Sequence, residues 1–370
     1  MKILDFYVLK QFIRNFLFGL LCFVLIFILV DLFENIDKFI DKNLSNSLIV
    51  QYYIYFIPEI LKLITPVSML LATLFTFSRF NKYSESTAVS SAGISIYRFS
   101  VPLILFGLFV TLFSFYFNGW LVPRFNSEKL YIERNYLGKN IIPGVISNLH
   151  FQDSENKIIA IGSYNESEKT AYNTTINIFD KKEYSKLLYR FDVKILKWDS
   201  IKNGWKLIDI LERKFDTINS ESLVFIDTSY SEEISEIGKL YLSPSQLIKS
   251  QLKADELLIE DLKEHIITLE SSGQRVDREK VDYYSKISFP FSNLIVILFG
   301  ISISTNRRKS GTAVQFGISI LVTFIYLGFL KVSQTFGYNG DLNPLLTAWL
   351  ANILFLLLAI VNLLRMNYIK

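Results

Sequence analysis

Few residues in this sequence have the types and spacing that catalysis requires. No Gly-Lys pair followed by Ser or Thr occurs in a glycine-rich turn, so the sequence predicts no phosphate-binding loop. The two histidines, His150 and His265, are far apart, and the single cysteine, Cys22, has no partner in the chain, so neither a zinc site nor a disulfide is expected. No Gly-x-Ser-x-Gly nucleophile elbow occurs. We therefore expect no catalytic residue, metal or cofactor, and any ATP hydrolysis must occur in a partner protein.

The segment 79–95 has residues suited to protein docking. Ser84 can cap a short helix over 84–92, and Gly93 can end it. Most of its side chains are small, which permits close approach of another protein, and Glu85 lies in the first turn, where the helix dipole favours a carboxylate. Two interpretations remain open: a coupling helix docked on a cytoplasmic ATPase, or an ordinary interfacial helix with a solvated carboxylate. The expected docking residues are Ser84, Glu85, Ser86, Ala88, Ala92 and Gly93.

A second group of candidates lies where long apolar runs end. Ionisable residues within membrane segments are functional candidates, and here they would contact lipid. The alternative is that the charged residues reach the headgroup level and only anchor their helices. The candidate lipid contacts are Asp31, Phe33, Lys38, Lys42 and Lys331.

Six apolar runs must position these residues. Hydrophobic residues make up 51% of the chain, and about 20 apolar residues are needed to span a bilayer core. The first run could be a signal peptide, but it is long and no small-residue cleavage site follows it, so we predict a retained helix. The six predicted spans are 12–33, 54–77, 99–122, 287–304, 313–332 and 345–364.

Loop charges predict the orientation of these spans. With six spans, the basic residues fall on one side, which the positive-inside rule makes the cytoplasm. Both termini are then cytoplasmic, and the segment 123–286 lies outside the cytoplasm. The basic residues that give this result are Lys2, Lys10, Arg14, Arg79, Lys82, Arg98, Arg307, Arg308, Lys309, Arg365 and Lys370.

The long segment 123–286 contains two kinds of pattern. Turn clusters separate short strand signals, which predict a β-sandwich or an open jelly roll. A helix is predicted from Ser243 and Pro244, with Leu257, Leu258 and Leu262 at helical spacing and an end at Gly273. Its basic and acidic residues nearly balance over 145–228, so no nucleic-acid partner is expected. The predicted strands are 145–151, 157–164, 174–179, 186–198, 205–213 and 222–227.

The predicted fold is therefore a membrane α-helical protein of six transmembrane helices with a periplasmic, all-β, jelly-roll-like domain inserted between the third and fourth. The expected divisions are 1–122, with the short helix near 84–92; 123–286, with the β domain and a helical return; and 287–370.

An ordered set of short motifs runs through the whole chain and resembles the LptF/LptG (YjgP/YjgQ) permease family. No single motif is very specific, and the ordered set together with the topology carries the resemblance. The N-terminal Ile3-Leu4-Asp5-x-Tyr7 favours the LptG branch. The motifs are Pro58 and Pro66, Leu70-Leu71-Ala72, Glu85, Ala92-Gly93-Ile94-Ser95, Pro102, Leu121-Val122-Pro123 with Asn126, Lys286-Ile287-Ser288-x-Pro290, and Asn343-Pro344 with Trp349 and Asn352.

This resemblance implies a function and a set of partners. The chain would be a permease subunit of an ABC-type exporter in the bacterial inner membrane that extracts lipopolysaccharide and passes it to a periplasmic bridge. It would pair with a second permease of the same kind, an LptB ATPase dimer, LptC and LptA. Glu85 would contact the ATPase, and lipid would enter beside the first and fifth spans, the fifth having Gly317 and Gly328. Ile28 stands where some members have a lysine that meets lipid phosphate.

Three other functions remain possible on the residues alone. A membrane-anchored periplasmic scaffold or assembly factor would need neither an ATPase nor lipid transport, and co-purification of an ATPase would distinguish it. A lipoprotein-exporter permease usually has four spans, with its large domain between the first two, which disagrees with three spans before the insertion. A membrane enzyme is disfavoured because no catalytic group of residues was found.

Overall fold

The computed structural model describes residues 3–138, 145–166, 168–181, 186–215, 221–244, 247, 252–271, 275–306 and 312–366. Lys2, Gly273, Arg307, Arg308, Lys309 and Lys370, which entered the sequence predictions, lie outside these ranges. The chain divides into two compact units. The helical unit comprises Met1–Leu137, Ala254–Ile259 and Asp277–Lys370, and the sheet unit comprises Gly138–Lys253 and Glu260–Val276.

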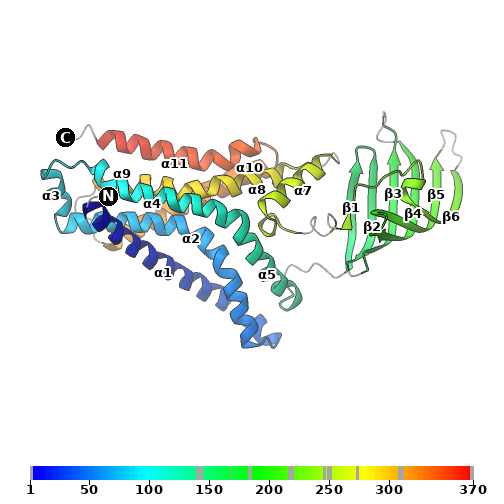
Figure 1. Cartoon of the computed structure of the whole chain (residues 1–370), viewed down its shortest axis with the longest axis horizontal. Coiled ribbons are helices and arrows are strands. Elements are labelled where there is room, and N and C mark those ends of the chain that lie inside the picture. Colours follow the sequence, from blue (N-terminus) through cyan, green and yellow to red (C-terminus); the bar gives the residue numbers. More distant parts are fainter. Residues whose placement is uncertain are drawn as a thin grey trace. The chain divides into compact units, whose positions relative to one another are not determined.

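Six helices of the described chain are long and apolar enough to cross a membrane, which confirms the six predicted spans (Figure 1). Each extends beyond its predicted apolar run, because polar turns continue the helix at one or both ends. The third and fourth are composite: a π-helical turn joins α4 to α5, and a 3-10 turn at Pro290 joins α8 to α9. The elements are α1 (Ile3–Asp41), α2 (Asn46–Lys82), α4 (Ile96–Tyr116) with η1 (Phe117–Leu121) and α5 (Val122–Asn135), α8 (Asp277–Ser288) with η4 (Phe289–Phe291) and α9 (Ser292–Asn306), α10 (Thr312–Tyr338) and α11 (Pro344–Met366).

Local chemistry explains where several of these helices begin and bend. The hydroxyl of Ser45 accepts a hydrogen bond from the amide of Leu48 and caps α2, and Ser95 caps α4 in the same way. Pro58 and Pro66 lie inside α2, which changes direction along its length in Figure 1. Prolines bend a helix because each removes one backbone hydrogen bond, and packed neighbours make them tolerable in membrane proteins.

Helix α2 is the centre of the helical unit. It packs against α1, α5, α9 and α10, and 67% of the residues in its most apolar stretch are buried, against 11% for α1. Its side chains Met69, Leu70 and Leu74 are fully buried in a cluster that also includes residues of α1, α4 and α9. Small side chains such as Ala72 in the same cluster let helix backbones approach closely, as is common between membrane helices.

Buried polar side chains tie α8, α10 and α11 together. The Tyr326 hydroxyl donates to Asn352 Oδ1 at 2.8 Å, and Asn352 Nδ2 donates to the carbonyl of Ser288 at 2.7 Å. Asn352, one of the residues that carry the family resemblance, is 2% exposed and connects two neighbouring helices. Such side-chain bonds give membrane helices a defined register.

The sheet unit contains one antiparallel sheet of six strands in the order β1-β2-β3-β4-β5-β6, which confirms all six strand predictions. Each strand pairs with its neighbour in the sequence, so the predicted all-β insertion is a meander (Figure 1). One face of the sheet is buried beneath Ile234, Ile237 and Leu240, and Trp205 of β5 donates its indole N–H to the carbonyl of Leu242. The strands are β1 (Val145–Ser154), β2 (Lys157–Asn165), β3 (Thr170–Phe179), β4 (Leu187–Asp199), β5 (Gly204–Phe215) and β6 (Glu221–Tyr230).

The helical return differs from the sequence prediction. Helix α7 covers Ile259–Ser271, so Leu262 lies in it, but Leu257 and Leu258 precede it and follow a short 3-10 turn, η3 (Ala254–Glu256). The prediction of one helix through these leucines was wrong. The leucines have helical spacing, but contacts with the helical unit hold 254–259 in a different conformation. One of these contacts is the hydrogen bond from Lys286 to the carbonyl of Leu257.

Close packing at Gly300 generates a stability prediction. A Cβ added there would meet Thr73 Cγ2 at 2.9 Å and Leu70 Cδ1 at 3.0 Å, whereas one added at Gly317 would meet nothing within 4 Å. We expect Gly300→Val to destabilise the protein by about 1–3 kcal/mol through overpacking between α2 and α9. Gly317→Val is the matched control, and thermal unfolding in detergent gives the comparison. Equal losses for both variants would contradict this account of the interface.

Candidate functional site

The predicted docking helix is present as α3 (Glu85–Ser91), between α2 and α4. Gly93 ends it with φ +77°, and the amide of Ile94 donates to the carbonyl of Val89 at 3.2 Å, which is the hydrogen-bond pattern of a glycine C-cap. Ser84 occupies the N-cap position but in a left-handed conformation, and its side chain makes no capping bond. The capping role predicted for Ser84 was therefore wrong: its backbone is left-handed, with φ 58°, whereas a serine that caps a helix with its side chain usually has an extended backbone.

Most side chains on the surface of α3 are small, and they are accessible. None of its residues is buried, and Ser84, Ala88, Ala92 and Gly93 are exposed. Ser86 is half-buried and donates a hydrogen bond to Asn81 Oδ1 at 2.7 Å, which fixes the helix to the end of α2. The side chains that face outward can therefore meet another protein without rearrangement.

Glu85 is held by a residue far away in the sequence. The Tyr7 hydroxyl of α1 donates to its carboxylate, at 3.1 Å from Oε2 and 3.3 Å from Oε1. Tyr7 also packs on the ring of Phe80 with centroids 5.8 Å apart. The Glu85 side chain is half-buried, and the Tyr7 hydroxyl orients its carboxylate. Sequence reasoning placed Tyr7 among the family motifs but did not connect it with Glu85.

Further contacts anchor the start of α1 beside α3. Arg98 of α4 forms a two-pronged pair with Asp5, with Nη1 to Oδ1 at 2.8 Å and Nη2 to Oδ2 at 2.9 Å. Arg79 of α2 donates to Gln11, which is also on α1. These contacts join α1 to both helices that flank α3.

The predicted lipid contacts lie on α1, on the turn after it and on α10. Asp31, near the other end of α1, accepts a hydrogen bond from the Tyr53 hydroxyl at 3.2 Å and is half-buried, so it joins α1 to α2. Phe33, Lys38 and Lys42 are exposed on or after the same helix. Lys331 is exposed on α10.

Two helices have wide apolar surfaces that none of the described residues covers. The middle of α1 exposes Leu17, Leu21 and Leu25, and Phe33 further along is 72% exposed. On α10, Phe324 is 78% exposed. The rings of Phe23 and Phe316 stack at 6.4 Å, so the two helices meet at that point. A Cβ added at Gly317 or Gly328 of α10 would meet no atom of the described residues within 4 Å.

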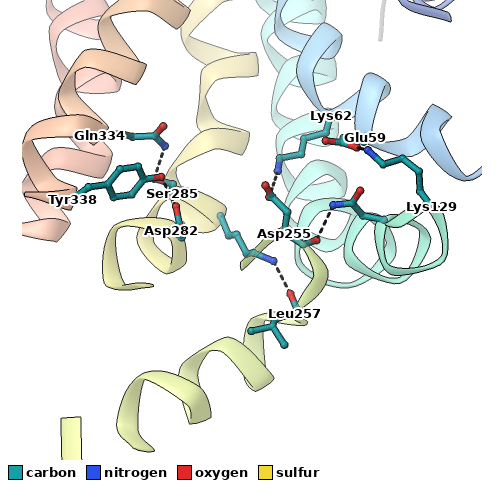
Figure 2. A network of polar contacts seen from close by, with 11 residues as sticks. Glu59, Lys62, Lys129, Asp255, Leu257, Asp282, Ser285, Gln334 and Tyr338 are labelled. Carbon is teal, nitrogen blue, oxygen red and sulfur yellow. Dashed lines mark hydrogen bonds and ion pairs between the residues drawn. The ribbon is translucent and has the colours of Figure 1, made fainter. Parts of the chain in front are cut away.

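A polar network at the end of the helical unit away from α3 was not predicted from the sequence (Figure 2). Lys129 of α5 pairs with Glu59 of α2 at 2.6 Å, and Lys62 of α2 pairs with Asp255 at 3.0 Å. Glu59 and Lys62 lie inside the predicted second span, and charges within an apolar run are themselves a signal of function or pairing. That signal was available, although nothing in the sequence could identify Asp255 as the partner.

The network continues through buried groups. Arg134 pairs with Glu256 at 2.6 Å, where the Glu256 side chain is fully buried, and Lys286 Nζ donates to the carbonyl of Leu257 at 2.6 Å. Figure 2 also shows Tyr338 directed at Asp282 and Gln334 at Ser285. Over the described residues, no group of three or more His, Cys, Asp or Glu is placed to hold a metal ion.

Comparison with known proteins agrees with this architecture. Residues 6–365 match the family described as "Lipopolysaccharide export system permease LptF/LptG". The chain is 23% identical to the lipopolysaccharide export system permease protein LptG of Escherichia coli K12 over 328 residues, which is 85% of this chain and 84% of that protein. It is 22% identical to LptG of Haemophilus influenzae over 276 residues, 74% of this chain and 72% of that one.

A relative from Aquifex aeolicus named only "Uncharacterized protein" is 26% identical over 253 residues, 68% of this chain and 65% of its own length, so the match spans slightly less than two thirds of that protein. The match over nearly the whole chain, together with six apolar helices and a sheet inserted in the sequence between the third and the fourth, shows that the chain belongs to the LptF/LptG family of lipopolysaccharide export system permeases.

Proposed function

We propose that this chain is the permease subunit of an ABC-type exporter that extracts lipopolysaccharide from the bacterial inner membrane and delivers it to a periplasmic bridge. The observation that carries the proposal is the uncovered apolar face of α1, in a chain of this family. Only 11% of the residues in the most apolar stretch of α1 are buried. That face requires lipid or another membrane protein against it, and an exporter supplies both.

The same proposal assigns partners. A second LptF/LptG-type subunit would complete the transmembrane part, an LptB dimer would bind below it, and LptC and LptA would receive the lipid. The relatives named LptG and the N-terminal motif favour the LptG branch. Sequence alone left open a scaffold without transport activity. Such a scaffold would not require an accessible coupling helix or a long uncovered helix face.

Orientation follows from the loop charges. Arg79 and Lys82 at the end of α2 support a cytoplasmic position for α3 by the positive-inside rule. With six helices, the sheet unit and the turn after α10 are then periplasmic, and both chain ends are cytoplasmic.

Cysteine labelling tests this orientation. After Cys22→Ser, a cysteine at Lys82 should be protected from an impermeant thiol reagent in intact spheroplasts, and a cysteine at Asn339 should react. Both positions are exposed, so accessibility within the protein is matched. Permeabilised cells provide the control, because both cysteines should then react. Labelling at position 82 from outside would refute the orientation.

Helix α3 is proposed as the coupling element that docks on the ATPase. Its exposed residues are small, so it fits a groove, and Glu85 provides one oriented carboxylate for a basic group there. The Tyr7 and Asp5 contacts give docking a mechanical consequence, because they join α3 and its neighbours to α1, the helix whose apolar face is uncovered.

Charge reversal at Glu85 tests the coupling role. Glu85→Lys should weaken association with the ATPase by about 2–5 kcal/mol if the carboxylate is buried in the interface. The amount of co-purified ATPase and the rate of lipopolysaccharide release measure the effect. Glu128→Lys makes the same charge change on α5 and should alter neither. Normal assembly and normal export in Glu85→Lys would reject the coupling role, and absence of any ATPase from the parent complex would support the scaffold.

Photo-crosslinking tests the lipid path. Lipopolysaccharide has several acyl chains and an anionic head, so it must enter sideways from the bilayer. Photoreactive residues at Phe33 of α1 and Phe324 of α10 should form lipopolysaccharide adducts. Leu357 of α11 is 57% exposed and is the control for random bilayer contact, so it should form few. Equal labelling at all three positions would contradict an entrance beside α1 and α10.

A further inference from the structure

Two arginines converge on one uncharged side chain where the first turns of α1 lie beside the last turns of α2 (Figure 1). Arg14 of α1 and Arg79 of α2 both donate a hydrogen bond to Gln11 Oε1. Because both contact the same oxygen, their donor nitrogens are at most about 6 Å apart. Gln11 is only 8% exposed, so the group that holds the two guanidiniums together is itself buried.

The positive charge of this arginine pair is not balanced by the residues that the structure describes. Within those ranges, neither guanidinium forms an ion pair with a carboxylate. The carboxylate of Asp5, earlier on α1, binds Arg98 through both oxygens. The carboxylate of Glu85 accepts the hydrogen bond of Tyr7. Two like charges at this separation repel each other, and an anion between them would remove the repulsion.

A chain of side-chain contacts holds the arginine pair in place. Gln11 Nε2 donates to Asn15 Oδ1 at 3.2 Å, and Asn15 Nδ2 donates to Thr76 Oγ1 of α2 at 3.1 Å. These bonds direct the amide oxygen of Gln11 toward the arginines. A guanidinium has five N–H donors in a fixed fork that matches the geometry of phosphate, so both arginines retain donors for an anion.

The face of α1 that carries Arg14 is uncovered over the next three turns. Phe18, Leu21 and Leu25 lie within about 40° of Arg14 around the helix axis, and each is more than half exposed. Lys10, one turn before Arg14, is exposed on the same side. From Arg14 to Leu25 the helix rises about 16 Å, which is close to half of a bilayer core of about 30 Å.

This order of groups matches one class of ligand. A glycerophospholipid has a phosphate at the headgroup level and acyl chains that reach through one leaflet. An anionic glycerophospholipid brings an uncompensated negative charge, whereas phosphatidylcholine carries a cation that cancels its own phosphate. Arg14 also lies inside the apolar run 12–33, and an ionisable residue within a membrane segment is a functional candidate by default.

We propose that Arg14 and Arg79 bind the phosphate of an anionic glycerophospholipid of the cytoplasmic leaflet, whose acyl chains lie along Phe18, Leu21 and Leu25. This lipid is a component of the membrane and not the transported lipid, and its leaflet rests on the orientation proposed above. Basic pockets between helices on the cytoplasmic side of a membrane hold anionic headgroups in this way. The phosphate neutralises the arginine pair, and the chains cover the first half of the exposed face of α1.

Photo-crosslinking in nanodiscs tests the lipid site. The purified complex is placed in phosphatidylcholine nanodiscs that contain a trace of either phosphatidylglycerol or phosphatidylcholine with a photoreactive acyl chain. Adducts over 17–25 should form at least about 5-fold more with the phosphatidylglycerol probe, since one basic residue near anionic lipid contributes about 1 kcal/mol. Unlabelled phosphatidylglycerol should compete with the probe, whereas glycerol phosphate and lipopolysaccharide should not.

Each other outcome overturns the proposal in a different way. Equal labelling by both probes would show that the arginines do not select an anionic headgroup. Competition by glycerol phosphate would show a site for free phosphate, and competition by lipopolysaccharide would show a site for the transported lipid. Absence of adducts over 17–25 with both probes would show that another protein covers this face.

Four variants separate recognition of charge from general damage. Arg14→Gln and Arg79→Gln should each reduce the preference for phosphatidylglycerol by about 5-fold, and Arg14→Lys, which keeps the charge, should retain most of it. Arg365→Gln removes an exposed arginine from the last turn of α11 and is the matched control, so its preference should equal that of the parent. A parent-like preference in both glutamine variants, or its loss in Arg14→Lys, would contradict the proposed site.

The phospholipid site and the proposed function can fail separately. If the complex does not export lipopolysaccharide but the preference for phosphatidylglycerol depends on Arg14 and Arg79, only the exporter assignment fails. If export proceeds and both probes label 17–25 equally, only the phospholipid site fails.

Discussion

The packing of α2 at the centre of the helical unit is the constraint on which the other features depend. Its buried face packs against α1, α9 and α10, and Gly300 of α9 allows a close approach to α2. Its last turn leads into α3. In its first half, Glu59 pairs with Lys129 of α5, and Lys62 pairs with Asp255. The two polar ends of α2 thus belong to one helix, which Pro58 and Pro66 interrupt near the end that carries Glu59 and Lys62.

Much of this architecture could be predicted because the bilayer imposes a coarse rule. Backbone groups must be paired within the membrane, so an apolar run such as 54–77 can only be a helix. The strands were equally clear, since alternation and turn clusters depend on neighbouring residues. Prediction was wrong where long-range contacts override local pattern: Leu257 and Leu258 follow helical spacing, yet the Lys286 bond to the Leu257 carbonyl holds an irregular segment.

The candidate sites show the same division. Small residues and the glycine after its last turn, Gly93, identified α3, because a short helix is determined largely by its own sequence. Ser84 is a residue type that often caps helices, but its backbone conformation does not allow the capping bond. The partner of Glu85 could not be inferred, since Tyr7 is brought to it only by the packing of α1 on α2. Asp255 and Lys62 are separated by nearly 200 residues, and no local signal pairs them.

The distribution of burial indicates how the molecule can change shape. Helix α1 is tied near its start by Asp5 and Gln11, and near its end by Asp31, while its middle is largely uncovered. Polar contacts at helix ends are directional and resist sliding, whereas apolar contact along a helix is non-directional and tolerates different neighbours. Lipid acyl chains and the second subunit proposed above are both apolar neighbours. In the proposed exporter, replacing one by the other along α1 would therefore cost little in dispersion energy, because lipid tails are as apolar as the leucines of a second helix.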